Sequence, residues 1–274
     1  MLCFCFWLVV QIFLESFPVS SSGHCVLFEL YIKKHHYQIN HYNDYFLHAG
    51  ASSIMSIALL DHFVHGVTVV MIALFFFSRW WWLLIHLRRC YTIIAKIISL
   101  TFIADVMTFC LYLLFHYYLF SIPLAIGFSI TALLLLSLYF VPDYPMVSKR
   151  QSLTWCKAVI LGLVQGFCLL PGISRFAGTY VCARWMGISP HKSFEISWLF
   201  FWPLITVAFI HSAAIIVITT PQSLLLTPAV ILLMVATGLV SLCALKGVAR
   251  IAYAQKLWWF GFYMIVPIVV SCFV

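Results

Sequence analysis

The stretch Pro18-Val19-Ser20-Ser21-Ser22-Gly23-His24 ends the first apolar run of the chain, and Pro171-Gly172-Ile173-Ser174-Arg175-Phe176-Ala177-Gly178-Thr179 ends a later one. Each stretch has a proline three residues before a serine, and each follows an apolar run that carries a glutamine, Gln11 or Gln165. Polar, helix-breaking sequence at membrane depth occurs only where protein buries it or where it lines a cavity. Two such breaks in corresponding positions of two halves predict a site where the halves meet.

The composition indicates a polytopic membrane protein. Of the 274 residues 65% are hydrophobic and 8% are charged, against roughly 25% charged residues in a soluble domain. Basic loops and attraction to anionic lipid account for the net charge of +8, so no nucleic-acid partner is expected. The ten cysteines form no C-x-x-C pair, which argues against a disulfide framework or a cysteine zinc site. The apolar start has no basic n-region or small-residue cleavage site and is not interpreted as a signal peptide.

The apolar runs divide into long and short ones. Two short runs, Met1–Leu14 and Trp155–Leu170, end at the two motifs and are interpreted as first arms of re-entrant hairpins. The polar segment from Ser22 to about Asn43 is predicted to be an interfacial loop or a surface-lying segment. A span takes about 20 apolar residues. The predicted spans are Ile57–Phe77, Leu100–Phe120, Ile122–Val141, Ile196–Thr219, Leu224–Leu245 and Leu257–Val274.

Basic residues cluster in three connections and suggest the orientation. Arg79 to Lys96 form the first cluster, Lys149 to Lys157 the second and Lys246 to Lys256 the third. If each motif returns to the side from which it enters, all three connections share one face, which the positive-inside rule makes cytoplasmic. The first hairpin then enters from outside and the second from the cytoplasm.

The predicted fold class is therefore all-α, a polytopic membrane protein with an inverted-topology repeat. Each half consists of a re-entrant hairpin plus three transmembrane helices. The chain is treated as a single integral membrane domain, 1–274, with pseudo-repeats 1–148 and 149–274.

Arg175 is the sharpest candidate in the second motif. A guanidinium at membrane depth is costly without an anionic partner, and its planar fork suits a phosphate. Gly172, Gly178 and the start of a helix would add backbone N–H groups that bind anions. The alternative is an arginine that snorkels to the interface or pairs structurally with a carboxylate.

The first motif supplies groups for chemistry. Ser20, Ser21 and Ser22 offer hydroxyls as nucleophiles or phosphate donors, with the His24 imidazole close by for proton transfer. The alternative for the serines is a plain helix cap. Glu15 could orient His24, hold a divalent cation or be the structural partner of Arg175, and the sequence does not rank these roles.

Other polar residues at the ends of spans receive weaker interpretations. Asp61, His65 and Thr68 enter a span in the first half, and Glu195 heads a span in the second, where a helix cap is slightly favoured over a role in the site. The remaining histidines show no ligand spacing and are assigned no role.

These residues resemble the undecaprenyl-diphosphate phosphatase (bacitracin-resistance) family. That family's first signature, E-G-x-T-E-F-L-P-V-S-S-T-G-H, is matched without gaps from Gln11 to His24, and its second, P-G-x-S-R-S-G-A-T, from Pro171 to Thr179. A stretch resembling F-D-V-x-x-H-x-G-T falls on Asp61, His65 and Thr68. A run resembling E-x-S-F-x-x-x-x-P falls on Glu195, Ser197 and Pro203.

The resemblance implies a hydrolase of the bacterial plasma (inner) membrane whose active site faces outside. It would convert undecaprenyl diphosphate to the monophosphate and inorganic phosphate, which recycles the lipid carrier for peptidoglycan synthesis and confers bacitracin resistance. A divalent cation, Mg or Ca, is expected with Glu15 as its ligand. A homodimeric assembly is kept open. The implied catalytic residues are Glu15, Ser21, His24 and Arg175, with Ser21 and His24 both open as nucleophile. The implied substrate-binding residues are Ser20, Ser22, Gly23, Gly172, Ser174 and Thr179.

Two departures fall inside the motifs. Gln11 stands where the first signature has glutamate, and Phe176-Ala177 stands where the second has Ser-Gly. These changes keep an alternative open, in which a catalytically weakened homologue binds or flips a polyprenyl phosphate as a transporter.

Overall fold

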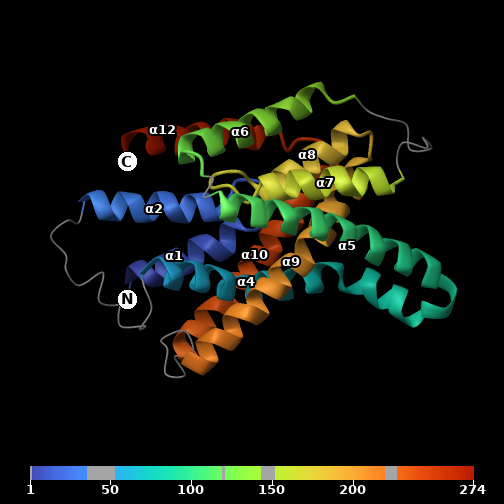
Figure 1. Ribbon diagram of the computed structural model, residues 1–274, viewed down its shortest axis with the longest axis horizontal. Coiled ribbons are helices and arrows are strands. Elements are labelled where there is room, and N and C mark those ends of the chain that lie inside the picture. The colour runs from blue at the N-terminus through green and yellow to red at the C-terminus, as the bar shows by residue number, and fades with distance from the viewer. Residues whose placement is uncertain (1, 36–52, 119–120, 143–151, 220–226) are drawn as a thin grey trace.

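The computed structural model describes residues 2–35, 53–118, 121–142, 152–219 and 227–274, and the elements in these ranges are helices (Figure 1). The first half contains α1 (Leu2–Leu14), α2 (Ser21–His35), α4 (Ser53–Ile85), α5 (Leu87–Tyr117), α6 (Leu124–Ser137) and the short η1 (Leu138–Phe140). The second half contains α7 (Trp155–Phe167), α8 (Arg175–Trp185), α9 (Pro190–Thr219), α10 (Pro228–Tyr253), α11 (Trp259–Tyr263) and α12 (Ile265–Phe273).

The two broken segments form helical hairpins that point at each other. α1 and α2 enter from the left of Figure 1 and α7 and α8 from the right, so that the tips meet near the centre. Each hairpin is followed by two long helices and a short helical stretch. Within the described residues, this order and the opposed hairpins agree with the predicted inverted repeat, although the third helix of each half is shorter than a predicted span. The predicted boundary between residues 148 and 149 lies outside the described residues.

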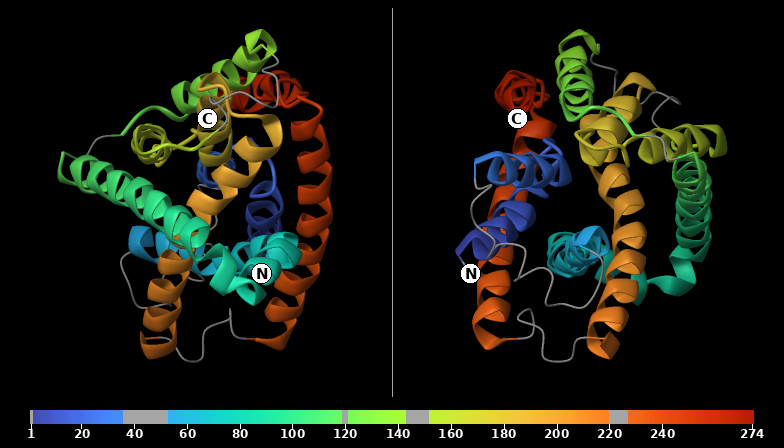
Figure 2. Two further views of the ribbon diagram at one scale, coloured as in Figure 1. Left: turned by 90° about the vertical axis from the view of Figure 1, so that its right-hand side faces the viewer. Right: turned by 60° about the vertical axis from the view of Figure 1, so that its left-hand side comes forward.

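Each hairpin is packed against the other half. α5 of the first half packs along α7, and α10 of the second half packs along α1. α4 packs on its counterpart α9, and α6 packs on α11 and α12. In the right-hand view of Figure 2, α4 lies between α9 and α10. Neither half therefore surrounds its own hairpin alone.

The two glutamines of the apolar runs have equivalent places in this arrangement. Gln11 Nε2 of α1 donates to Asp61 Oδ1 of α4 at 2.6 Å, and Gln165 Nε2 of α7 donates to the Phe200 carbonyl of α9 at 3.3 Å. Both glutamines are buried. Each one fixes the first arm of its hairpin to the long helix that follows the hairpin.

The lengths of the helices confirm some spans and shorten others. Four helices of the described part are long and apolar enough to cross a membrane, at Leu59–Ile85, Leu87–Tyr117, Pro190–Ile218 and Pro228–Tyr253. The predicted spans at Ile122–Val141 and Leu257–Val274 are shorter apolar helices. The chain is a multi-pass membrane protein.

One prediction about the first motif is wrong. The segment from Ser22 to Asn43 is not a loop over its first part, because α2 continues to His35 and forms the second arm of the hairpin. This return arm carries Gly23, His24 and Glu29 among its apolar residues, so its composition resembles that of a surface segment. Residues 36–43 lie outside the described residues.

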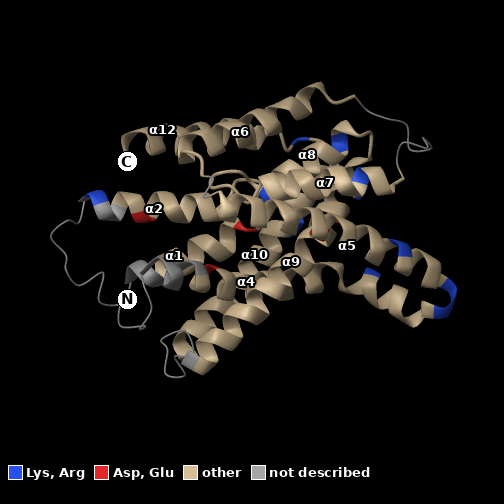
Figure 3. Ribbon diagram, in the orientation of Figure 1, with Lys and Arg blue, Asp and Glu red and all other residues tan. Residues whose placement is uncertain are grey.

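Basic residues gather at one end of the molecule. In Figure 3 most lysines and arginines lie in the right-hand part, over α5, α7 and α8, while the acidic residues near the centre lie by the hairpin tips. The α7–α8 hairpin enters from this basic end, and the α1–α2 hairpin enters from the opposite end. Lys149 and Arg150 of the second basic cluster lie outside the described residues.

Candidate active site at the meeting hairpins

The hairpin tips touch through two glycines. A Cβ atom on Gly23 would lie 2.9 Å from Gly172 Cα and 2.8 Å from Phe128 Cε1. Gly172 has φ +83°, a conformation that side chains rarely adopt, and its backbone packs against α6. Because Gly23 and Gly172 have no side chains, the two hairpin tips can approach each other closely. Neither glycine lines the pocket described next.

A small polar pocket lies between the tips and presents the start of a helix from each hairpin. Ser20 caps α2 by accepting from Gly23 N–H at 3.3 Å, and Ser174 caps α8 by accepting from Ala177 N–H at 3.3 Å. Two helix N-termini thus face one space, and both favour an anion there. The lining residues are Leu14, Glu15, Phe17, Ser20, Ser21, Ser22, Ile173, Ser174, Arg175, Phe176 and Phe201.

The pocket is closed in this structure. Its free space is about 20 Å³, room for about one water molecule.

Glu15, Ser21 and Arg175 form the charged centre of the pocket. The Ser21 hydroxyl donates to Glu15 Oε2 through a short hydrogen bond. Arg175 Nη2 lies 3.8 Å from Glu15 Oε1, and its guanidinium carbon stands 4.5 Å from the centre of the Phe201 ring. Phe201 supports the guanidinium by a cation–π contact. The structure brings together a hydroxyl, a carboxylate beside it and a cation, one of them from the opposite hairpin.

His24 lies beside this centre with its ring turned away from the pocket. Nδ1 lies 2.8 Å from the Ser20 carbonyl oxygen, so this nitrogen donates, and Nε2 accepts from the Tyr263 hydroxyl at 3.2 Å. The ring stacks on Tyr263 and meets Phe128 edge-on. His24 does not line the pocket.

Thr179 of the second motif also lies away from the pocket. Its hydroxyl donates to the Arg175 carbonyl one turn earlier, at 2.8 Å, and its side chain is buried. Of the residues that the sequence proposes for substrate binding, Ser20, Ser22 and Ser174 line the pocket, whereas Gly23, Gly172 and Thr179 do not.

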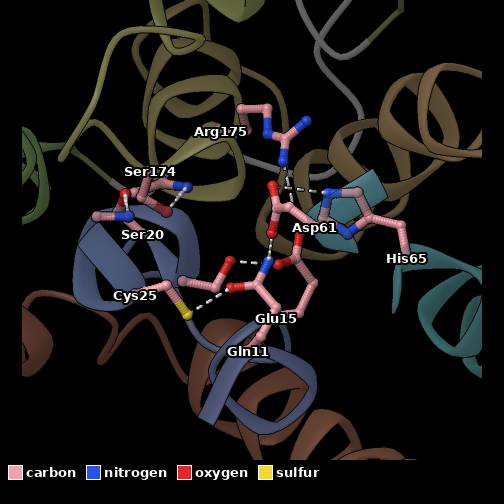
Figure 4. A network of polar contacts seen from close by, with 11 residues as sticks. Gln11, Glu15, Ser20, Cys25, Asp61, His65, Ser174 and Arg175 are labelled. Carbon is pink, nitrogen blue, oxygen red and sulfur yellow. Dashed lines mark hydrogen bonds and ion pairs between the residues drawn. The ribbon is translucent and has the colours of Figure 1, made fainter. Parts of the chain in front are cut away.

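A second polar group, on α4, lies beside the pocket without lining it (Figure 4). Asp61 accepts from Gln11, and Asp61 Oδ2 lies 3.8 Å from His65 Nε2. His65 also meets Phe201 edge-on, on the ring that supports Arg175. The sequence placed Asp61 and His65 at the entry of a span and in the resembling stretch F-D-V-x-x-H-x-G-T, without assigning them to the site. Their i, i+4 spacing, which puts them on one helix face, was a further signal.

Glu15, the expected cation ligand, contacts two polar side chains, and its cation stays a prediction. Its carboxylate accepts from the Ser21 hydroxyl and lies beside the Arg175 guanidinium. The neighbouring Gln11 Oε1 accepts from the Cys25 thiol at 3.1 Å while its amide nitrogen donates to Asp61. The guanidinium of Arg175 offsets part of the charge of the carboxylate.

Two further expectations are clarified by the structure. Phe176 lines the pocket but packs its ring on Trp198, 5.1 Å between centroids, within a buried aromatic cluster.

Glu195 is neither a cap nor a pocket residue, because it lies within α9 and pairs with Arg79 of α4. The cap prediction was wrong since α9 begins earlier than expected, at Pro190.

Sequence comparison matches residues 6–270 to the family described as bacitracin resistance protein BacA. The chain is also similar to undecaprenyl-diphosphatases from Desulfatibacillum aliphaticivorans (32% identical, covering 40% of this chain and 39% of the relative) and Treponema denticola (31% identical, 51% and 50%). It is 38% identical to that of Leptospira biflexa over 23% of each chain. The matches thus span half or less of these relatives' lengths. Since the family match covers nearly the whole chain, including both hairpins and the pocket between them, this protein belongs to the bacitracin resistance protein BacA family.

Proposed function

We propose that this protein hydrolyses undecaprenyl diphosphate to undecaprenyl phosphate and inorganic phosphate. The observation that carries the proposal is the Ser21–Glu15–Arg175 centre between two helix N-termini. A hydroxyl beside a carboxylate is a nucleophile with its base, and a guanidinium with helix N-termini neutralises phosphate charge. The family and the names of the relatives agree with this activity.

In the proposed first step, Ser21 Oγ attacks the terminal phosphorus and its proton passes to Glu15. The bond from that phosphorus to the bridging oxygen breaks, and undecaprenyl phosphate leaves with the electron pair. Arg175 and the backbone N–H groups at the starts of α2 and α8 bind the equatorial oxygens.

In the second step, water attacks the phosphoserine. Glu15, having released its first proton to solvent, accepts a proton from the water and returns it to Ser21 Oγ as inorganic phosphate leaves. Ser21 is preferred to His24 as nucleophile because both ring nitrogens of His24 are engaged and its ring lies outside the pocket lining.

The presence of an apolar groove favours a lipid as the substrate. It lies between α4, α9 and α10, has a volume of about 370 Å³, and its lining includes Met71 and Leu242. Ser16, the residue after Glu15, connects the hairpin tip to this lining. Its hydroxyl lies 3.5 Å from Met71 Sδ and donates to the carbonyl of Ser241, the neighbour of Leu242, at 2.9 Å. We place the isoprenoid chain in this groove, with the diphosphate at the hairpin tips.

The proposed location of the chemistry is the outer face of the bacterial plasma membrane. The hairpin that carries Glu15 and Ser21 enters from the end opposite the basic residues, which the positive-inside rule assigns to the cytoplasm. At that face the reaction would return the lipid carrier to peptidoglycan synthesis and oppose bacitracin. A homodimer remains a prediction.

The test is phosphate release from undecaprenyl diphosphate by protein purified in detergent. The native chain should release phosphate, and Ser21→Ala should lose at least about 10²-fold in rate because the nucleophile is gone. Ser99→Ala is the matched control, since Ser99 lies on α5 away from the pocket and donates only within its own helix.

Two results would overturn the proposal. Lipid binding without phosphate release would favour the binding or flipping transporter, which the comparisons do not support. Full activity in Ser21→Ala would refute the serine as nucleophile and direct attention to His24.

A further inference from the structure

Three metal-ligating side chains gather on one face of α4, outside the Glu15 centre. Asp61, His62 and His65 each offer one donor atom, and these atoms all lie within 4.8 Å of one another. The spacing i, i+1, i+4 explains this, because His65 lies one turn beyond both of its partners. The expectation that the remaining histidines lack ligand spacing therefore does not hold for His62.

The donor atoms lie somewhat farther apart than in an occupied metal site. Ligand atoms in a tetrahedral site with bonds of 2.0–2.2 Å lie about 3.3–3.6 Å apart. Asp61 Oδ2 and His65 Nε2 are 3.8 Å apart and all three donor atoms lie within 4.8 Å, so the three side chains would close in on a bound ion. Asp61 and His65 are mostly buried, whereas His62 is exposed and leaves an entry path.

Asp61 is held in place by a partner that leaves one oxygen for a metal. Gln11 Nε2 donates to Oδ1 at 2.6 Å, while Oδ2 faces His65. Hydrogen bonds of this kind orient metal ligands and increase affinity. Gln11 is uncharged and is not itself one of the ligands. Its role is to orient the Asp61 carboxylate.

This sequence differs from the family pattern at two of the residues just described, His62 and Gln11. The resembling stretch F-D-V-x-x-H has an apolar residue where this chain has His62, and the first signature has glutamate where this chain has Gln11. One potential ligand is absent on α1, at Gln11, and another is present on α4, at His62, the neighbour of the Asp61 to which Gln11 donates.

We propose that Asp61, His62 and His65 bind a divalent metal ion of the Zn²⁺ class. Two imidazoles with one carboxylate suit such ions better than Mg²⁺ or Ca²⁺, which prefer oxygen ligands. Three protein ligands leave coordination positions open. Phe201, which contacts both His65 and Arg175, sets this site beside the phosphate pocket.

Metal binding is measured directly, without lipid substrate. The full chain is purified in detergent on a tag without histidine, stripped with EDTA, and titrated with Co²⁺ as a visible-absorbing probe. The native chain should bind one Co²⁺ per chain, Zn²⁺ should displace it, and Mg²⁺ in large excess should not. His62→Val, which restores the residue of the family pattern, should weaken Co²⁺ binding at least tenfold.

The controls separate this site from folding and from the hydrolase. His116→Ala removes an exposed histidine of α5, stacked on Tyr112, and should bind Co²⁺ like the native chain. Unchanged Co²⁺ affinity in both His62→Val and Asp61→Asn, with native melting temperatures, would overturn the proposal. Because the readout is metal binding, it is independent of whether the chain releases phosphate.

Discussion

The contact between the hairpin tips is tight enough for a single methyl group to test it. In Gly23→Ala the new Cβ would lie 2.8 Å from Phe128 Cε1, 2.9 Å from Gly172 Cα and 2.9 Å from Ser20 Oγ. Phe128 is fully buried and Gly172 Cα is backbone, so neither moves at low cost. Overpacking costs about 1–3 kcal/mol, and the better helix propensity of alanine recovers about 1 kcal/mol. We expect a net loss of about 1 kcal/mol in unfolding free energy.

Gly247→Ala is the matched control, because a Cβ at this position of α10 meets nothing within 4 Å. The same exchange should there stabilise the protein by up to about 1 kcal/mol through helix propensity alone. The two variants should therefore differ by about 4–8 °C in melting temperature, measured in one detergent, taking roughly 2–4 °C per kcal/mol.

The same pair of variants tests whether the tips position the chemistry. A shift of Gly23 away from Gly172 also moves Ser21 relative to Arg175, so phosphate release should fall at least about tenfold in Gly23→Ala and stay unchanged in Gly247→Ala. If Gly23→Ala melts no lower than Gly247→Ala and keeps full activity, the tips are not in the described contact.

Three further outcomes follow from the site. Arg175→Ala should lower phosphate release about 10²–10³-fold, with Arg175→Lys between it and the native chain because lysine lacks the planar fork; near-normal turnover of the alanine variant would contradict the clamp. Gln11→Glu places a second carboxylate against Asp61, so in EDTA this variant should melt at a lower temperature than the native chain, and Mg²⁺ should restore its melting temperature. Equal melting temperatures in EDTA would contradict the Gln11–Asp61 hydrogen bond. Val235→Trp should fill the apolar groove and raise KM for undecaprenyl diphosphate but not for a short-chain prenyl diphosphate; Leu232→Trp, on the same helix outside the groove, is the control, and equal effects of the two would remove the groove from substrate binding.

The fold was predictable to the extent that it depends on broken apolar runs. The prolines, glycines and serines after Leu14 and Leu170 mark hairpin tips because they come together, and such a cluster favours a turn and a new helix cap over a continuing helix. The return arm α2 was missed since it carries more polar residues than α1, although it packs against α1 and α6. Composition alone cannot distinguish a polar arm that is covered by protein from a polar loop that is covered by water.

The residue types of the site were predictable from the sequence, but the directions in which their side chains point were not. Glu15, Ser21 and Arg175 converge as their chemistry suggests, while His24, from the same motif, turns to Ser20 and Tyr263. Tyr263 is 239 residues away in sequence, and no local pattern specifies such a partner. The addition of Asp61 and His65 likewise depends on how α4 packs against α1.

The exchange of hairpins between the halves determines when the site can form during synthesis. Ser241 of α10 donates to the Ile12 carbonyl of α1 across 229 positions, and α1 carries buried Gln11 and leads directly into buried Glu15. The first hairpin leaves the ribosome early but reaches its final contacts only after α10 has entered the bilayer. Until then its polar residues need water, lipid headgroups or the insertion machinery as temporary partners. A ribosome stalled before residue 228 should therefore yield a membrane-inserted chain whose first hairpin is open to labelling, whereas release of the full chain should protect it.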